Sequence, residues 1–138
     1  MARTVKINDL GEAVSKILKE YGDNVTEGTK KAVLEVATIA KQETQAASPF
    51  KPGKPSYHGK HYRSGWVVRE EVFDRFRSDA IVHNRTRYQL AHLLEKGHAL
   101  RHGGRTIGSV GARVHIAPAE QNAIKNLEEA IEKIAQQG

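Results

Sequence analysis

The chain has 138 residues, of which 38% are hydrophobic and 6% aromatic, and a formal net charge of +6. This length and composition predict one domain with a small core. The absence of cysteine excludes disulfides and thiolate metal sites, and it favours a cytosolic or virion setting over a secreted one. No apolar run approaches the roughly 20 residues that a membrane helix needs, and MARTVKINDL lacks the apolar core of a signal peptide.

The charge is unevenly distributed. Residues 1–47 hold seven basic and seven acidic side chains, residues 48–117 hold thirteen and five, and residues 118–138 hold two and four. All seven histidines also lie in the basic middle region. Such a region can bind nucleic acid, or it can meet an acidic patch on another protein, including another copy of the chain. The charge alone does not decide between nucleic acid and protein as the partner, and we favour a contact with protein.

Two helices are expected in residues 1–47. The first is predicted over Asp9–Tyr21, where apolar residues recur at spacings of three and four, and Gly22 is expected to end it. The second is predicted from residues 24–26 to Ala47, and Ser48-Pro49 stops it because the residue before proline is pushed out of the helical region.

The next stretch, residues 48–61, is predicted to be a long basic loop. It contains three prolines, two glycines, and Lys51, Lys54 and Lys60, and it shows no periodicity. A loop of this length is either a linker or an arm that becomes ordered on a partner. We expect Lys51–His61 to be mobile in the free subunit.

A small antiparallel sheet is predicted next. Tyr62–Phe73 and Arg77–Asn84 alternate in polarity and form a hairpin, with Trp66 as a core anchor. A short helix over Thr86–Lys96, capped by Thr86, ends at Gly97. A glycine-rich loop, expected to be mobile over Ala99–Gly111, leads to a third strand over 113–117.

The last element is a helix over residues 118–138, with Pro118 in its first turn and an apolar stripe. Glu128, Glu129 and Glu132 are expected on the other side of this helix, in solvent or facing basic neighbours. The chain is therefore predicted to be a single α+β domain. Its parts are helices in 1–47, a basic loop in 48–61, a sheet and glycine-rich loop in 62–117, and a helix in 118–138.

No chemical motif predicts an enzyme. His92, His98 and His102 have zinc-like spacing, but the glycines around them argue against a helix there. Glu95 and His98 suggest an acid and a base without a nucleophile. The segment 103–108 matches a phosphate loop only loosely, and the adjacent carboxylates Glu70 and Glu71 are expected on opposite faces of a strand. We expect no catalytic, metal or cofactor site.

Several short motifs follow one another in a recognisable order. They are Arg63-Ser64-Gly65-Trp66, Tyr88, Leu94-Glu95-Lys96-Gly97-His98 and Ala112-Arg113-Val114-His115-Ile116-Ala117-Pro118-Ala119. This order resembles the siphophage neck or tail-completion proteins, the family named after gene product ten of phage HK-ninety-seven. The segment LLEKGHALRHGGR is similar to the Gram-positive phage or prophage branch of that family. The resemblance covers nearly the whole chain. Val114 departs from it, because the family often has proline there.

The resemblance implies a virion structural protein at the head–tail interface, assembled in the host cytoplasm. It implies a homo-oligomeric ring that contacts connector or stopper proteins and tail-terminator or tail-tube proteins, with DNA only passing through. Candidate contact residues are the basic and acidic side chains Lys51, Lys54, Lys60, Arg63, Arg101, Arg105, Glu128, Glu129 and Glu132. The competing class is a small basic nucleic-acid-binding protein, including a nuclease-type toxin.

Overall fold

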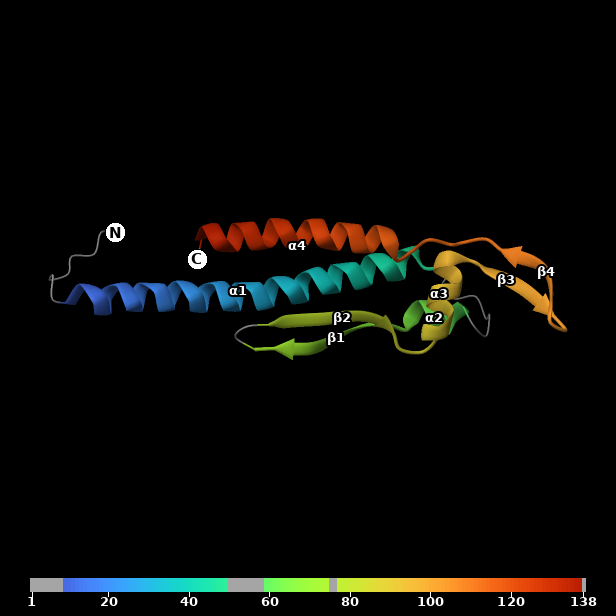
Figure 1. The fold of residues 1–138 in the computed structure, drawn as a ribbon, viewed down its shortest axis with the longest axis horizontal. Coiled ribbons are helices and arrows are strands. Elements are labelled where there is room, and N and C mark those ends of the chain that lie inside the picture. The colour runs from blue at the N-terminus through green and yellow to red at the C-terminus, as the bar shows by residue number, and fades with distance from the viewer. Residues whose placement is uncertain (1–8, 50–58, 75–76, 138) are drawn as a thin grey trace.

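The computed structural model describes residues 9–49, 59–74 and 77–137, and it confirms a mixed fold of helices and antiparallel sheets (Figure 1). The elements in chain order are α1 (Leu10–Ala47), α2 (Gly59–Ser64), β1 (Trp66–Phe73), β2 (Ser78–Asn84), α3 (Tyr88–Lys96), β3 (His98–His102), β4 (Arg105–Val110) and α4 (Ala117–Gln137). The larger part of the predicted loop Lys51–His61 lies outside the described residues, although Gly59 and the residues after it belong to α2.

Helix α1 is the long axis of an elongated molecule. Its 38 residues make a rod of about 57 Å, while the 21 residues of α4 reach about 32 Å at 1.5 Å per residue. In Figure 1, α4 runs back along α1, the β1–β2 hairpin lies along the other side of α1, and β3–β4 projects beyond the end of α1. Because α4 is the shorter helix, the first turns of α1 extend past it.

Both ends of α4 are fastened to α1. The hydroxyl of Tyr21 donates a hydrogen bond to the carbonyl of Ala135 at 2.9 Å, and the amide of Asn122 donates to the carboxylate of Glu43 at 3.2 Å. Near the first of these bonds, Gly28 of α1 lies against the side chain of Ile134. The two helices therefore form one antiparallel pair in a fixed register.

The prediction of two N-terminal helices was wrong, because α1 runs unbroken through Gly22. A glycine in a helix costs about 1 kcal/mol relative to alanine, which weakens a helix without forcing it to end. The Thr26 hydroxyl also donates to the Gly22 carbonyl at 2.8 Å. Packing of α4 against the residues that follow stabilises the helical conformation across this position.

Gly22 and Gly28 provide a matched test of this helix. A Cβ added at Gly22 meets nothing within 4 Å, whereas one at Gly28 comes to 3.0 Å from Cγ2 of Ile134. We expect Gly22→Ala to raise the free energy of unfolding by about 0.5–1 kcal/mol. Gly28→Ala should raise the free energy of unfolding by less, because the added methyl group crowds the side chain of Ile134 on α4. Urea denaturation followed by circular dichroism checks both, and equal gains would contradict the close α1–α4 packing.

The first predicted hairpin is confirmed in its pairing and corrected at its start. Strands β1 and β2 are antiparallel, from Trp66 opposite Asn84 to Phe73 opposite Ser78, with a bulge between Glu70 and Val72. The expected start of β1 at Tyr62 was wrong, because Tyr62 belongs to α2. The Gly65 N–H donates to the Tyr62 carbonyl at 3.1 Å and closes that turn before the strand begins.

The glycine-rich segment forms a second hairpin instead of the expected loop. Strands β3 and β4 pair antiparallel, from His98 opposite Val110 to His102 opposite Arg105. Gly103 and Gly104 connect them with φ angles of 57° and 79°, the left-handed conformation that a type I′ two-residue hairpin turn requires at both positions. The pattern of many glycines indicated flexibility, but two of them are turn residues.

The predicted third strand over 113–117 was also wrong, so the chain has two separate two-stranded sheets within the described residues. The N–H of Arg113 donates to the carbonyl of Leu94 at 2.6 Å, and the N–H groups of residues 115–117 donate to the carboxylate of Glu95. These donors are therefore not available to a strand ladder. Helix α4 begins at Ala117, one residue before the predicted start.

The short central helix begins at Tyr88, two residues later than predicted, so Arg87 and not Thr86 stands at its N-cap position. Asn84 holds the two residues before the helix in place, because its side-chain oxygen accepts hydrogen bonds from the backbone N–H of Thr86 at 3.2 Å and of Arg87 at 2.8 Å. Gly97 ends the helix as predicted, with a φ of 74°. No helix in the described part of the chain is long and apolar enough to cross a membrane.

Candidate functional site

A buried joint lies where α1 ends and α4 begins, and Glu95 on α3 is its central acceptor. Its carboxylate accepts hydrogen bonds from the backbone N–H groups of His115 at 2.8 Å, Ile116 at 3.0 Å and Ala117 at 2.9 Å. The first N–H groups of a helix have no partner inside the helix, and a negative charge is favourable beside them. Glu95 therefore caps α4 from another helix.

The pKa of Glu95 reflects this arrangement. Its partial burial raises the pKa, but the N–H groups of His115, Ala117 and Ile116 outweigh that effect and hold the pKa below its ordinary value. Hydrogen bonds to the ionised form favour that form. The carboxylate is thus a charged cap at neutral pH.

His115 extends the joint from Glu95 to Tyr62. Its side chain is buried, with Nδ1 at 2.7 Å from the carbonyl of Arg113 and 3.0 Å from Glu95 Oε2, and Nε2 at 2.5 Å from the Tyr62 hydroxyl. We assign the Nδ1–H tautomer from this network, because the carbonyl only accepts and Nε2 then accepts from the hydroxyl. Burial first, and the charge of Glu95 second, raise the pKa of Tyr62 to about 12.

Trp66 completes the joint and connects it to α1. The rings of Tyr62, Trp66 and His115 meet edge to face, with centroids 5.6–6.0 Å apart. The indole N–H donates to the Ser48 hydroxyl at 2.8 Å, which donates to the carbonyl of Thr44 at 2.7 Å. The prediction of Trp66 as a core anchor is confirmed, since only 4% of it is exposed.

The chain of carboxylate, imidazole and phenol in this joint resembles an acid–base relay. Tyr62 is fully buried and His115 is 1% exposed, so neither ring presents an open face to a substrate. Their polar atoms bond to one another and to the backbone. The described residues contain no group of three or more potential metal-ligating His, Cys, Asp or Glu side chains. The joint holds α2, α3 and the start of α4 together. The expectation that the protein has no catalytic or metal site remains a prediction.

The predicted contact residues fall into separate places. Lys51 and Lys54 lie outside the described residues, and Lys60 lies in α2 with a side chain that is also outside the description. Arg63 donates to the carbonyl of Ala46 at 3.1 Å, and so stabilises the C-terminal end of α1. Arg101 and Arg105 are on the β3–β4 hairpin, and Glu128, Glu129 and Glu132 are on α4.

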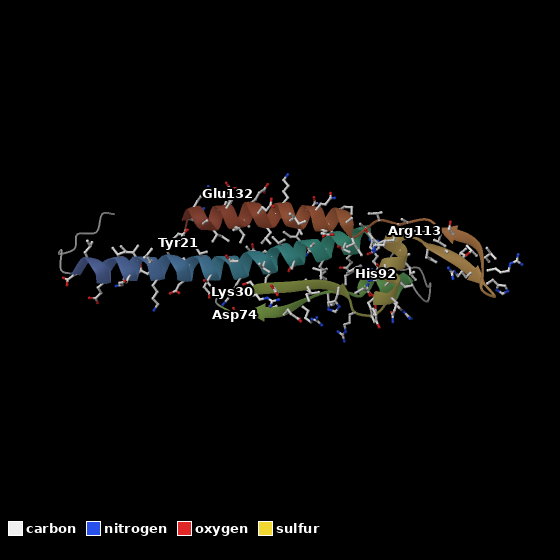
Figure 2. All side chains as sticks on the ribbon, viewed as in Figure 1. Tyr21, Lys30, Asp74, His92, Arg113 and Glu132 are labelled. Atoms are coloured by element: carbon white, nitrogen blue, oxygen red, sulfur yellow. The ribbon has the colours of Figure 1, made fainter. Side chains whose placement is uncertain are left out.

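The structure does not bring the basic hairpin and the acidic face of α4 together within one chain. In Figure 2, Arg113 marks the base of the hairpin and Glu132 lies toward the far end of α4. Every residue from Ala99 to Ser109 is exposed, and so are Glu128, Glu129 and Glu132. These two charged surfaces are available to partners.

Among the exposed large apolar side chains, three groups lie on elements that also carry the candidate contacts or project from the fold. They are Leu10, Val14, Ile17, Leu18 and Tyr21 on the first turns of α1, Ile124 and Ile131 on α4, and Leu100 and Ile107 on the β3–β4 hairpin. On α4 they line a shallow groove of about 530 Å³ together with Leu127, Glu128 and Glu132. Contiguous apolar surface with a polar rim is typical of protein-interaction sites.

Sequence reasoning missed the role of Glu95 and His115. It placed Glu95 beside His98, its neighbour in the chain, but the imidazole near its carboxylate belongs to His115. A signal was present, because Ile116 precedes a helix that starts with Ala117 and Pro118, and no Ser, Thr, Asp or Asn stands there to cap it. A helix start without a local cap indicates a cap from elsewhere.

Comparison with known proteins identifies no relative. No family model matches the chain, no curated protein matches it significantly, and no solved structure does so either.

Proposed function

We propose that this protein is a structural component of a tailed-phage virion, located at the head–tail interface. Identical copies form a ring that helps to join the head to the tail. The observation that carries the proposal is the meeting of three motifs that resemble the neck family. Trp66 of the first, Glu95 of the second and His115 of the third form one buried joint, although they are far apart in the sequence.

The surface supports a role in assembly. Within the described residues only Ala32, Val36, Ala37, Tyr62, Trp66 and Ala119 form the buried apolar core, while a longer set of large apolar side chains is exposed on α1, α4 and the β3–β4 hairpin. Large exposed apolar surfaces are uncommon on proteins that remain monomeric. The distribution is that of a subunit whose faces are covered by neighbours.

The partners we propose are further copies of the chain, the connector or stopper on one side and the tail-terminator or tail-tube protein on the other. DNA passes through the ring without being held tightly. The second candidate, a nucleic-acid-binding protein, is favoured by one observation, which is the exposed Arg101, His102 and Arg105 at the end of the β3–β4 hairpin.

Two experiments test the proposal. Negative-stain imaging and mass photometry of the purified protein should show closed rings. Deletion of the gene in the phage or prophage that carries it should give separate heads and tails with few joined particles. Normal yields of intact infectious virions from the deletion strain would refute the proposal.

Salt dependence distinguishes the second candidate. Each phosphate contact to duplex DNA lowers the slope of log affinity against log salt by about 0.9. We expect weak DNA binding that disappears at moderate salt. Tight binding that persists at high salt would favour the nucleic-acid-binding function.

A further inference from the structure

We propose that the β3–β4 hairpin of one copy docks on the acidic, apolar groove of α4 in the neighbouring copy. This contact would be the repeating interface of the assembly. The inference rests on the proposed function in one respect, namely that the partner is a second copy of this chain.

The β3–β4 hairpin is built to be covered by a partner. Its residues from Ala99 to Ser109 are exposed, and among the described elements the two strands contact chiefly each other. Leu100 is 41% exposed and Ile107 is 69% exposed. An isolated two-stranded hairpin is marginally stable in water, so a partner that covers these side chains would stabilise it.

The groove on α4 complements the hairpin in charge, and both surfaces carry apolar side chains. Ile124, Leu127 and Ile131 form its apolar floor, and Glu128 and Glu132 form its rim. The two carboxylates are four residues apart on one helix, where like charges destabilise. Within the described part of the chain neither forms an ion pair, and neither do Arg101 and Arg105. Arginines placed beside these glutamates would relieve the repulsion.

The contact must form between chains. The hairpin is joined to the rest of the fold near the start of α4, where Arg113 bonds to Leu94 and Glu95 caps the helix. Glu128 lies eleven residues further on, about 16 Å along the helix at 1.5 Å per residue. Figure 1 shows the hairpin pointing away from α4, beyond the end of α1, so it cannot reach the groove of its own chain without refolding.

The symmetry follows from this geometry. The hairpin and the groove are different patches on one molecule, so the contact is heterologous, and a pair of copies still has one free hairpin at one end and one free groove at the other. Repeating such a contact produces a closed ring when the rotation between copies closes, and a filament when it does not. A two-fold dimer would instead place the same patch on both sides.

Exchange of charge between the two surfaces tests the interface. The hairpin variant is Arg101→Glu with Arg105→Glu, and the groove variant is Glu128→Arg with Glu132→Arg. Each variant alone juxtaposes like charges, so we expect self-association to weaken by more than about tenfold. An equimolar mixture of the two should assemble again, because every hairpin then meets a groove of opposite charge. The variant with all four changes should assemble alone.

Sedimentation velocity and mass photometry on the full chain measure these assemblies, and circular dichroism verifies that each variant is folded. The control variant is Arg69→Glu with Arg85→Glu, which makes the same charge change on exposed residues of β1 and just after β2. It should assemble like the unmodified protein. Recovery of assembly in the mixture excludes misfolding as the reason for the single-variant defects.

The remaining outcomes separate this interface from the proposed function. If each charge-reversed variant alone forms rings as well as the unmodified protein does, the proposed interface is refuted and the proposed virion function is unaffected. A protein that stays monomeric at every concentration would overturn both. A hairpin variant that assembles normally and loses only DNA affinity would identify the hairpin as a nucleic-acid arm. If virion yields stay normal after gene deletion while the mixture of charge-reversed variants assembles as expected, the proposed function is refuted and the proposed interface is supported.

Discussion

Replacement of Glu95 by alanine should lower the free energy of unfolding by about 3 kcal/mol, because it removes acceptors from three backbone N–H groups at a helix start. The three bonds, at 2.8–3.0 Å, connect α3 to α4 across about twenty residues of sequence. Without the carboxylate, the start of α4 and the buried ring of His115 lose a common anchor. Urea denaturation followed by circular dichroism measures the change.

The effect should depend on pH with a definite sign. The folded pKa of Glu95 lies below its unfolded value of about 4.5, so the carboxylate contributes stability that is present above that pH. The contribution is lost as pH falls through the folded pKa. Glu95→Gln should therefore lose stability at pH 7 and show a flatter decline in acid than the unmodified protein does.

Glu129 on α4 is the matched control for Glu95, since it is an exposed glutamate that does not line the groove. Glu129→Ala should change stability by less than about 0.5 kcal/mol, as is usual for surface substitutions. If Glu95→Ala is no worse than Glu129→Ala, the carboxylate is not the cap of α4.

Replacement of Trp66 by alanine is the second large effect, and we expect it to cost about 3–5 kcal/mol, as is usual for a buried aromatic residue. Trp66 is 4% exposed, packs edge to face on Tyr62 and His115, and donates to Ser48. Its removal leaves a cavity where α1, α2 and β1 meet. Because it is the only tryptophan, circular dichroism must follow the unfolding of this variant.

Two further variants test the hydrogen bond of Trp66 and provide a control on an exposed aromatic residue. Ser48→Ala keeps the ring and leaves the indole N–H without its acceptor, at a cost of about 1–3 kcal/mol. Tyr88→Ala removes an aromatic ring that is 64% exposed and should have little effect. A Trp66→Ala variant as stable as Tyr88→Ala would show that the joint does not hold the fold together.

The sequence alone determined the elements whose signals are local. Apolar residues at spacings of three and four identified the faces of α1 and α4, alternation identified β1 and β2, and Gly97 ended α3 because its φ of 74° suits glycine. The exposure of Glu128, Glu129 and Glu132 also followed from helical spacing. Their expected place opposite the apolar stripe did not, because Glu128 and Glu132 line one groove with apolar residues of that stripe. In each case the decisive residues lie within one or two turns of one another.

The tertiary structure decided the rest, because those choices depend on partners far away in the chain. Packing of α4 keeps α1 continuous through Gly22, where local propensity favoured a break. Turn geometry at Gly103 and Gly104 makes strands of a segment whose composition indicated a loop. Glu95 accepts hydrogen bonds from the N–H groups of residues 115–117, which a third strand would have needed for pairing. A side chain that caps a helix twenty residues away leaves no periodicity in the sequence, so only the folded chain shows which donors it satisfies.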